Sequence, residues 1–303
     1  MKHLQKEKIL IHKMVNNNLS FIFFGTPTVA SKTLAILKDN GYIPSIIITS
    51  PDTKSGRGLM IQETPVSLWA KENNIKCFKP IKIDNDFIKY LNDYLISEKI
   101  NIDLQIVVAY GKILPEILIN NHKFGTLNIH YSLLPLYRGA SPLESALLNG
   151  DEKTGVCIQQ MAYKLDSGNI LFEEKISIDT QDTKEEIREK LISIGANNLV
   201  KLIPNIINNN LKPKIQAEGL ATYCKKIKKE DGEISINDNQ KDNWNKYRAF
   251  EGWPGVFFFI NKGNRILRIK IVEAKYENNS FVIKRVIPEG KKDMSYEEFL
   301  KWN

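Results

Sequence analysis

An asparagine and a histidine stand two residues apart in the segment NIHYSLLPLYR, which covers residues 128–138. Side chains two apart on a strand point to the same face, so Asn128 and His130 can converge on one ligand. A lone aspartate, Asp166, follows in KLDSGNIL and can reach the same place from a later turn. These residue types can stabilise an oxyanion and move protons, but they include no covalent nucleophile.

Direct transfer of an acyl group between two amines suits this set of side chains. The amide of Asn128 can donate a hydrogen bond to the oxyanion of a tetrahedral intermediate, where one donor typically contributes about 3–4 kcal/mol. His130 can share that role or move a proton. Asp166 can orient His130 and hold a water that carries protons between the nitrogens. A structural histidine at a strand end and a turn-forming aspartate remain the alternative interpretations.

Two other motifs give weaker indications of function. Ser132 lacks the G-x-S-x-G setting of a nucleophilic serine, so the segment SLLP is interpreted as a loop that offers backbone groups and apolar walls to a flat ligand. The segment FFGTP contains a glycine turn but not the G-x-G-x-x-G pattern of dinucleotide sites.

The elements that must position these residues follow from the hydrophobic pattern. Short apolar segments alternate with helical ones, which predicts an α/β fold with an open, mostly parallel, Rossmann-like sheet. The expected strands are LSFIFFG, PSIIIT, IDLQIVVAYG and GTLNIHYS, followed by antiparallel strands at TGVCIQQMAYKL and NILFEEKISI. Ligands bind beyond the carboxyl ends of such strands, which here carry Gly25-Thr26-Pro27, Ala109-Tyr110-Gly111 and His130. A helix capped by Asp182 or Thr183 is expected to end near residue 207.

The pattern changes after this helix. The polar stretch NNNLKPKIQAEG reads as a linker, and the short alternating apolar segments beyond it predict a smaller C-terminal β-barrel of OB-like type. We therefore expect an N-terminal extension at 1–18, a catalytic domain at 19–207 and a C-terminal β domain at 208–303. The N-terminus lacks the features of a secretory signal.

Charge is concentrated in the last third of the chain. The net charge is +8, and residues 211–303 hold 19 Lys and Arg against 13 Asp and Glu, a net +6. This favours a polyanionic partner such as nucleic acid, although a solvated lysine-rich surface is the alternative. Three scattered cysteines and the absence of long apolar runs favour a cytoplasmic protein with no membrane span, disulfide framework or metal site.

These residues, in this order, resemble the methionyl-tRNA formyltransferases. The similarity includes FFGTPTVAS, VVAYGKILP, GTLNIHYSLLPLYRGASPLESALLNGDEKTGVCIQQM and KLDSGNIL, and in the last third TYCKKIKKEDGEI and NKYRAFEGWPGVFF. It runs from about residue 19 to the end. The sequence differs from the usual family pattern at Val29, at Ala162 and Tyr163, and at Glu251 and Gly252.

The resemblance implies roles for particular residues. It places the catalytic Asn, His and Asp at Asn128, His130 and Asp166. It implies that the donor is 10-formyltetrahydrofolate, bound by Val108, Tyr110, Gly111, Ser132, Leu133, Leu134 and Pro135. It implies that the acceptor is the amino group of methionyl initiator tRNA, and that a loop around Arg57 contacts the acceptor end. The candidate acceptor contacts are Gly25, Thr26, Pro27, Arg57, Arg138, Lys226, Lys228 and Arg248.

Two alternatives stay open at this point. A related formyltransferase could act on a small amine, either glycinamide ribonucleotide or an amino sugar nucleotide. A folate- or RNA-binding module without activity is the second alternative, although the intact set of three polar residues speaks against it. We expect a monomer that needs no metal.

Overall fold

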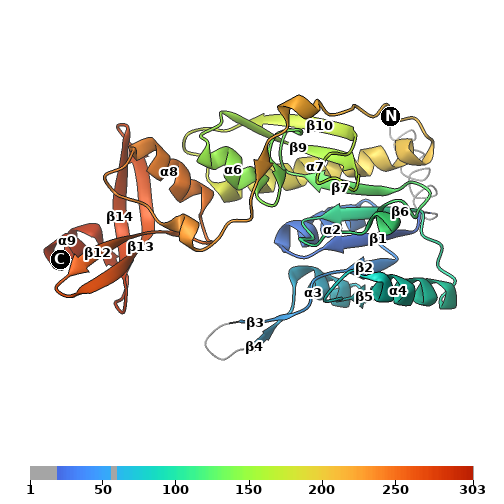
Figure 1. The fold of residues 1–303 in the computed structure, drawn as a ribbon, viewed down its shortest axis with the longest axis horizontal. Helices are drawn as coiled ribbons and strands as arrows, with labels where there is room; N and C mark the ends of the chain where they lie inside the picture. Colours follow the sequence, from blue (N-terminus) through green and yellow to red (C-terminus); the bar gives the residue numbers. More distant parts are fainter. Residues whose placement is uncertain (1–18, 56–59, 303) are drawn as a thin grey trace, which may run out of the picture. The chain divides into compact units, whose positions relative to one another are not determined.

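A seven-stranded sheet forms the centre of the larger part of the molecule (Figure 1). The computed structural model describes residues 19–55 and 60–302. The strand order is β10-β9-β7-β6-β1-β2-β5. The strands are β1 (Phe21–Gly25), β2 (Ile46–Ile48), β5 (Cys77–Phe78), β6 (Leu104–Val108), β7 (Thr126–His130), β9 (Lys153–Gln160) and β10 (Ile170–Ser177).

The pairing confirms the predicted mostly parallel sheet. Strand β1 is parallel to β2 and β6, β2 is parallel to β5, and β6 is parallel to β7, whereas β7 and β9 are antiparallel. The chain progresses outward from β1 through β2 to β5 and then returns to β6 on the other side of β1. The order therefore reverses between β1 and β6, and ligands bind at such a point, beyond the carboxyl ends of the strands.

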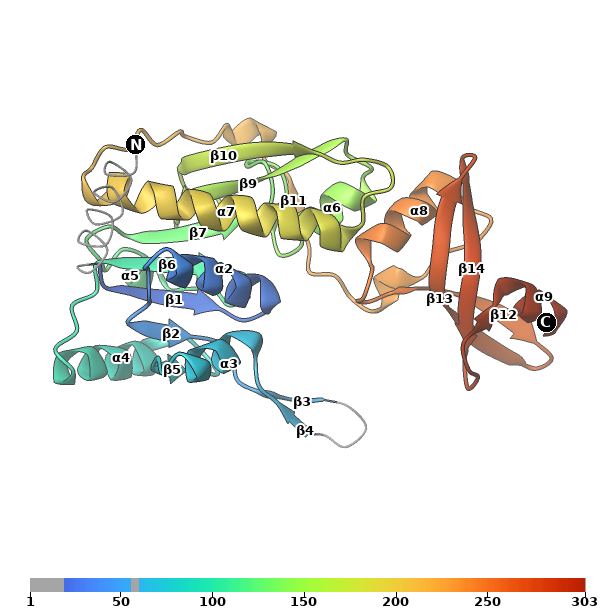
Figure 2. The same cartoon turned by 180° about the vertical axis from the view of Figure 1, so that it is seen from behind.

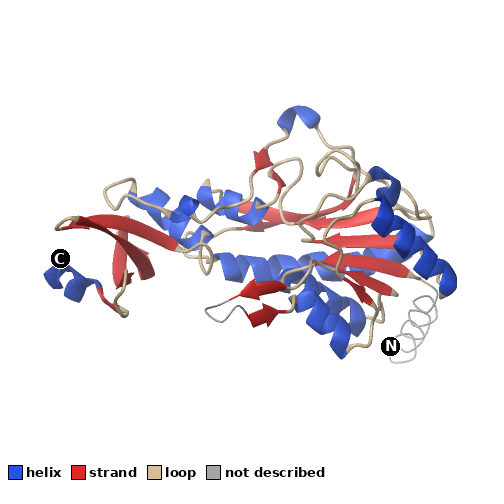
Figure 3. Ribbon diagram, turned by 60° about the horizontal axis from the view of Figure 1, so that its bottom comes forward, coloured by secondary structure: helices blue, strands red, loops and turns tan. Residues whose placement is uncertain are grey.

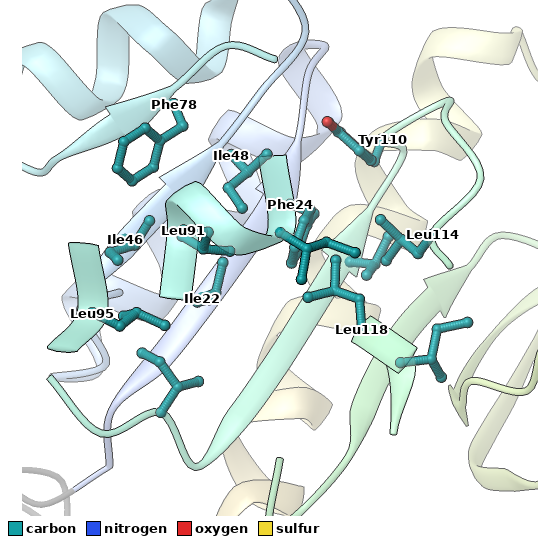
Figure 4. Close-up of a cluster of buried hydrophobic side chains, with 14 residues drawn as sticks. Ile22, Phe24, Ile46, Ile48, Phe78, Leu91, Leu95, Tyr110, Leu114 and Leu118 are labelled. Carbon is teal, nitrogen blue, oxygen red and sulfur yellow. The ribbon is translucent and has the colours of Figure 1, made fainter. Parts of the chain in front are cut away.

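Helices cover both faces of this sheet. They are α2 (Thr28–Asp39), α3 (Pro65–Glu72), α4 (Asn85–Ser97), α5 (Glu116–Ile119) and α7 (Lys184–Ile207). Apolar residues of α4 and α5, such as Leu91 and Leu118, pack in one buried cluster with Ile22 and Phe24 of β1 (Figure 4). Figure 2 shows α7 and α2 together on one side of the sheet, and Gly195 of α7 lies close to Ile129 and Val156.

By internal contacts the chain divides into two compact units that are not continuous in sequence. The first comprises residues 1–138, 156–174 and 190–221, and the second comprises residues 139–155, 175–189 and 222–303. The predicted division places a single boundary between 207 and 208. The difference arises because two central segments belong with the C-terminal residues: α6 (Pro142–Leu148) packs against α8 (Gln240–Ala249), and Trp244 of α8 donates a 2.7 Å hydrogen bond to the Thr180 carbonyl.

The C-terminal part contains the predicted smaller β domain. Its sheet has four strands in the order β12-β13-β14-β15 (Figure 3). They are β12 (Val256–Lys262), β13 (Arg265–Glu277), β14 (Ser280–Pro288) and β15 (Met294–Ser295), and all neighbours are antiparallel. Within the described residues β12 and β15 are the end strands of this order, and Glu233 forms an isolated parallel bridge with Phe257 of β12. Helices α8 and α9 (Tyr296–Trp302), which the hydrophobic pattern did not predict, complete this domain.

Short elements account for the remaining regular structure. They are the hairpin of β3 (Thr53–Ser55) and β4 (Met60–Gln62), the small sheet of β8 (Arg138–Gly139) and β11 (Tyr223–Cys224), and 3₁₀ helices at Glu218–Leu220 and Glu230–Gly232. The predicted N-terminal extension lies outside the described residues. In the described part of the chain, none of the helices has the length and apolar character needed to span a bilayer.

Candidate functional site

The structure brings Asn128, His130 and Asp166 together beyond the middle of the large sheet. Asn128 and His130 lie on β7, two residues apart, and Asp166 lies in the turn between β9 and β10. The Asn128 amide nitrogen is 3.4 Å from Asp166 Oδ1, and His130 Nδ1 is 3.7 Å from Asp166 Oδ2. All three side chains are largely buried, which strengthens any electrostatic interaction among them.

The imidazole of His130 is held from both sides. Its Nε2 lies 2.9 Å from the carbonyl oxygen of Tyr137, which can only accept, so Nε2 carries a hydrogen and donates. Its Nδ1 faces the Asp166 carboxylate. Because Nε2 is engaged by the backbone, Nδ1 is the ring atom that can donate or exchange a proton at the site.

Gln159 is a site residue that the sequence analysis missed. Its amide nitrogen donates a 3.0 Å hydrogen bond to Asp166 Oδ1. In the antiparallel pairing of β7 and β9, Gln159 lies directly opposite Asn128, so the two side chains share a face. The available signal was the predicted antiparallel strand through TGVCIQQ, although a register is needed to choose between its two glutamines.

The backbone around Asp166 also depends on a distant residue. Asp166 has φ +46°, in the left-handed region, and its carbonyl accepts a 2.8 Å hydrogen bond from the Gln216 side chain. Gly168 follows where a Cβ atom would lie 1.8 Å from the Gln160 carbonyl oxygen, so only glycine fits this turn. The sequence offered no signal for Gln216, which lies in the stretch interpreted as a linker.

The loop after β7 is fixed by internal contacts. The hydroxyl of Ser132 is fully buried and donates a 2.6 Å hydrogen bond to the Leu136 carbonyl, and the Leu134 amide donates to Cys157 Sγ at 3.4 Å. Leu134 is buried, whereas Leu133 and Pro135 are half-buried. Ser132 therefore holds the loop in shape, consistent with the interpretation that it is not a nucleophile.

The ends of β1 and β6 lie at the point where the strand order reverses. Val108 is buried in β6, Gly111 has φ +72°, and the Tyr110 ring packs edge-on against Phe24 at 5.4 Å. Figure 4 places Tyr110 beside Phe24 at the border of the apolar cluster. The Tyr110 hydroxyl is buried without a hydrogen-bond partner, and burial raises its pKa. An orphaned donor at this point fits a polar ligand bound beyond the strand ends.

The first turn after β1 is tightly packed. A Cβ atom on Gly25 would lie 2.6 Å from Ala30 Cβ, so the turn needs glycine to bring α2 close to the strand. Thr26 Oγ1 accepts a 3.3 Å hydrogen bond from the Ser50 amide. The Pro27 carbonyl accepts from the Ala30 amide at the start of α2, and the Pro27 ring is exposed.

Two of the candidate acceptor contacts, Arg138 and Arg248, are buried among protein partners. Arg138 is fully buried, with its guanidinium bound to Gln216 and Glu218. Arg248 is 4% exposed and donates a 2.8 Å hydrogen bond to the Asp179 carbonyl. Both guanidinium groups bind protein partners that hold the fold together, and their role as acceptor contacts stays a prediction.

The remaining candidate acceptor contacts divide into two groups. Lys226 and Lys228 are exposed on the segment after β11, as a phosphate contact requires. Arg57 lies outside the described residues.

The departures from the family pattern lie mostly at the surface. Exposed are Ala162, Tyr163, Glu251 and Gly252, whereas Val29 is half-buried on α2.

Comparison with known proteins agrees with this geometry. Residues 17–203 match the family model described as formyl transferase, and residues 226–282 match formyl transferase, C-terminal domain. A methionyl-tRNA formyltransferase from Sulfurihydrogenibium sp. (strain YO3AOP1) is 39% identical over 259 residues, which covers 84% of this chain and 81% of the relative.

Solved structures show the same fold. A methionyl-tRNA formyltransferase from Clostridium thermocellum superposes with a TM-score of 0.60 at 20% identity, covering 89% of this chain and 98% of that one. An N-formyltransferase from Helicobacter canadensis, in complex with folinic acid and dTDP-3-aminofucose, has a TM-score of 0.60 at 20% identity, covering 86% of this chain and 89% of that one. The matches of both family models, and the close relative along most of the sequence, show that this chain belongs to the methionyl-tRNA formyltransferase family.

Proposed function

We propose that this protein transfers the formyl group of 10-formyltetrahydrofolate to the amino group of methionyl initiator tRNA. The observation that carries the proposal is the convergence of Asn128, His130 and Asp166, with separations of 3.4 and 3.7 Å, at the carboxyl edge of the sheet. These groups can serve a direct transfer between two nitrogens. The identity of the acceptor is inferred from the names of the relatives.

The reaction begins when the neutral amine of the aminoacyl group attacks the formyl carbon of the donor. The carbonyl oxygen becomes an oxyanion, to which the Asn128 amide donates one hydrogen while its second faces Asp166. In its doubly protonated form, His130 also donates from Nδ1 to the same centre while Nε2 donates to the Tyr137 carbonyl. The attacking nitrogen then loses its proton through a water held by Asp166, and N10 of the folate gains a proton as the carbon–nitrogen bond breaks.

The two halves of the sequence take different parts in this proposal. Residues 19–207 form the catalytic domain, and the basic residues 208–303 bind the tRNA backbone through Lys226, Lys228 and neighbouring charges. The folate lies beyond the ends of β6 and β7, where the Tyr110 hydroxyl and the loop of residues 132–135 face it. The protein acts as a cytoplasmic monomer beside the translation machinery.

A second acceptor class is the amine of a sugar nucleotide. It is favoured by the shared fold of the Helicobacter canadensis N-formyltransferase, whose complex contains an amino sugar nucleotide. At 20% identity this likeness concerns the fold, whereas the basic C-terminal third fits a polyanionic acceptor better than a small one.

A formylation assay decides between these acceptors. The purified protein and 10-formyltetrahydrofolate are incubated with charged initiator tRNA, with glycinamide ribonucleotide and with a dTDP-amino sugar, beside His130→Ala as a control. We expect kcat/KM to be highest for the tRNA and to fall sharply in the variant. A higher kcat/KM for either small amine overturns the proposed acceptor, and equal background rates in both proteins overturn the enzymatic function.

A further inference from the structure

The conformation of Asp166 is supported from outside its own turn. Its φ of +46° lies in the left-handed region, which aspartate enters more readily than most non-glycine residues but still at some cost, because the Cβ atom crowds the backbone. Such conformations persist where surrounding contacts fix them. The side chain of Asp166 contacts both Asn128 and His130, so the contacts that fix its backbone also fix the site.

Gln216 supplies these contacts through a single amide group. Its Nε2 donates to the Asp166 carbonyl at 2.8 Å and to the Gly168 carbonyl at 2.7 Å. The two hydrogens of one side-chain amide thereby bind two carbonyls of the same turn. Gln216 is 8% exposed, so these hydrogen bonds lie away from bulk water, where losing them is costly.

Arg138 fixes the orientation of that amide. Its Nε and Nη2 donate to Gln216 Oε1 at 3.1 and 2.8 Å. Arginine has donors only, so the amide oxygen must face it and the NH₂ group must face the turn. The buried guanidinium is balanced by Glu218, whose Oε2 lies 2.9 Å from Nη1.

The same short segment also holds His130. Tyr137, the residue before Arg138, accepts the hydrogen bond from His130 Nε2 through its carbonyl oxygen. The segment of residues 137 and 138 therefore anchors His130 directly and Asp166 through Gln216. A shift of one catalytic side chain relative to the other would require this segment or its partners to move.

We propose that Arg138 and Gln216 are positioning residues that hold Asp166 against Asn128 and His130. The proposal rests on the proposed formyl transfer and assigns these two residues to its catalytic site. Both residues are buried and make hydrogen bonds to protein groups. Both act by keeping Asp166 in its left-handed conformation.

The central test uses Gln216→Glu, which is nearly isosteric. The carboxylate can still accept from Arg138, with which it forms a new ion pair. It cannot donate to the two carbonyls, so the Asp166 turn loses its support. We expect kcat for formyl transfer to fall on the order of 10²-fold, the loss that a displacement of about 1 Å causes. KM for both substrates should stay near the wild-type values, whereas the thermal midpoint should fall, because two carbonyls lose a buried donor. Gln181→Ala, at an exposed glutamine remote in sequence from the site, is the matched control and should leave kcat unchanged.

A coupling measurement separates positioning from general destabilisation. In the Asp166→Ala background, Gln216→Ala and Arg138→Lys should cause no further loss of kcat, because their effect passes through the side chain already removed. An equal loss in both backgrounds overturns the proposal. So does a Gln216→Glu variant with wild-type kcat, or one in which KM rises while kcat is unchanged.

A crystal structure of Gln216→Glu makes the outcome independent of the assay. We expect Asp166 to leave the left-handed region and its carboxylate to move away from Asn128 and His130. An unmoved Asp166 overturns the positioning role even if kcat falls. If the wild-type protein transfers no formyl group to any amine, the proposed function fails, and this structure alone still shows whether Gln216 fixes Asp166.

Discussion

At the scale of single residues, the proposed reaction depends most on the hydrogen bond that Asn128 donates to the oxyanion. It lies on β7 with 9% of its surface exposed, and its amide makes a long, 3.4 Å contact with Asp166. That leaves donor capacity for an oxyanion that forms during the reaction. Its contribution should therefore appear in kcat more than in substrate binding.

Asn128→Ala should lower kcat by on the order of 10²–10³-fold, the usual result of removing one oxyanion donor. Single-turnover formylation of charged tRNA with saturating folate measures this loss. Asn169→Ala removes the amide of an exposed asparagine three residues after Asp166. It serves as the control and should retain full activity. A loss smaller than tenfold for Asn128→Ala excludes a main oxyanion role.

His122 gives a residue-scale prediction about pH and stability. Burial lowers its pKa from the ordinary 6.5, against the opposing influence of the Ile102 carbonyl and Asp103, and its Nε2 is buried without a partner. As the pH falls below about 6.5, the unfolded chain takes up a proton that the folded chain still resists. The free energy of unfolding therefore decreases toward acid, until the pH passes the lowered pKa of the folded state.

His122→Gln should remove this part of the pH dependence. Urea unfolding between pH 7 and pH 5 should show a shallower decline for the variant, by at most about 1.4 kcal/mol per pH unit in the affected window. The comparison of slopes is independent of any constant stability difference between the two proteins. Parallel curves for the two proteins contradict the assignment.

At the scale of elements, the start of α7 shows reciprocal capping. The Thr183 amide donates to Glu186 Oε2 at 2.9 Å, and the Glu186 amide donates to Thr183 Oγ1 at 3.3 Å. The sequence analysis offered Asp182 or Thr183 as the cap, and the structure selects Thr183. The acidic first turn of the helix adds a favourable interaction with the helix dipole.

Thr183→Ala should lower the free energy of unfolding by about 1 kcal/mol, since it removes one side of the capping box. Thr183→Ser keeps the hydroxyl and is the matched control, for which we expect a change of a few tenths of a kcal/mol. Denaturation by urea, followed by circular dichroism, measures both. Equal losses in the two variants would show that the hydroxyl does not cap the helix.

The sequence predicted most of the elements whose burial is apolar. Six strands of the large sheet and the helix α7 have continuous or periodic hydrophobic residues and follow in the expected order, whereas the two-residue β5 and the helix α4 were not predicted. Helix α8 was missed because its buried face is polar. Asn243 is buried and donates a 2.8 Å hydrogen bond to the Ser235 carbonyl, and Arg248 donates to Asp179. A face satisfied by hydrogen bonds leaves no hydrophobic period to read.

The same reason limits what could be predicted of the site. Asn128 and His130 were recognisable because strand geometry alone puts residues two apart on one face. Gln159 required the register between β7 and β9. Gln216 binds carbonyls 50 and 48 residues away in sequence, and Arg138 binds Gln216 from 78 residues away. Such long-range hydrogen bonds leave no local pattern.

At the scale of the whole molecule, the distribution of charge separates the two ends of the chain. The net charge of +8 comes mostly from residues 211–303, at +6, whereas the central part is nearly neutral. Folate is small, whereas tRNA carries a phosphate on every nucleotide. The basic end therefore predicts an affinity for tRNA that depends on salt.

Raising the salt concentration should weaken tRNA binding to the full chain, with a log–log slope of about 0.7–0.9 for each phosphate neutralised. Replacing Lys226 and Lys228 by serine should reduce the slope by about that amount for each lysine that contacts a phosphate. Replacing the exposed Lys82 and Lys89 of the nearly neutral central part removes the same charge and should leave the slope unchanged. Filter binding of charged initiator tRNA at several salt concentrations gives all three slopes. Because loss of net charge alone would lower both double variants equally, matching slopes for the two, or a flat response of the wild-type protein, would exclude Lys226 and Lys228 as phosphate contacts.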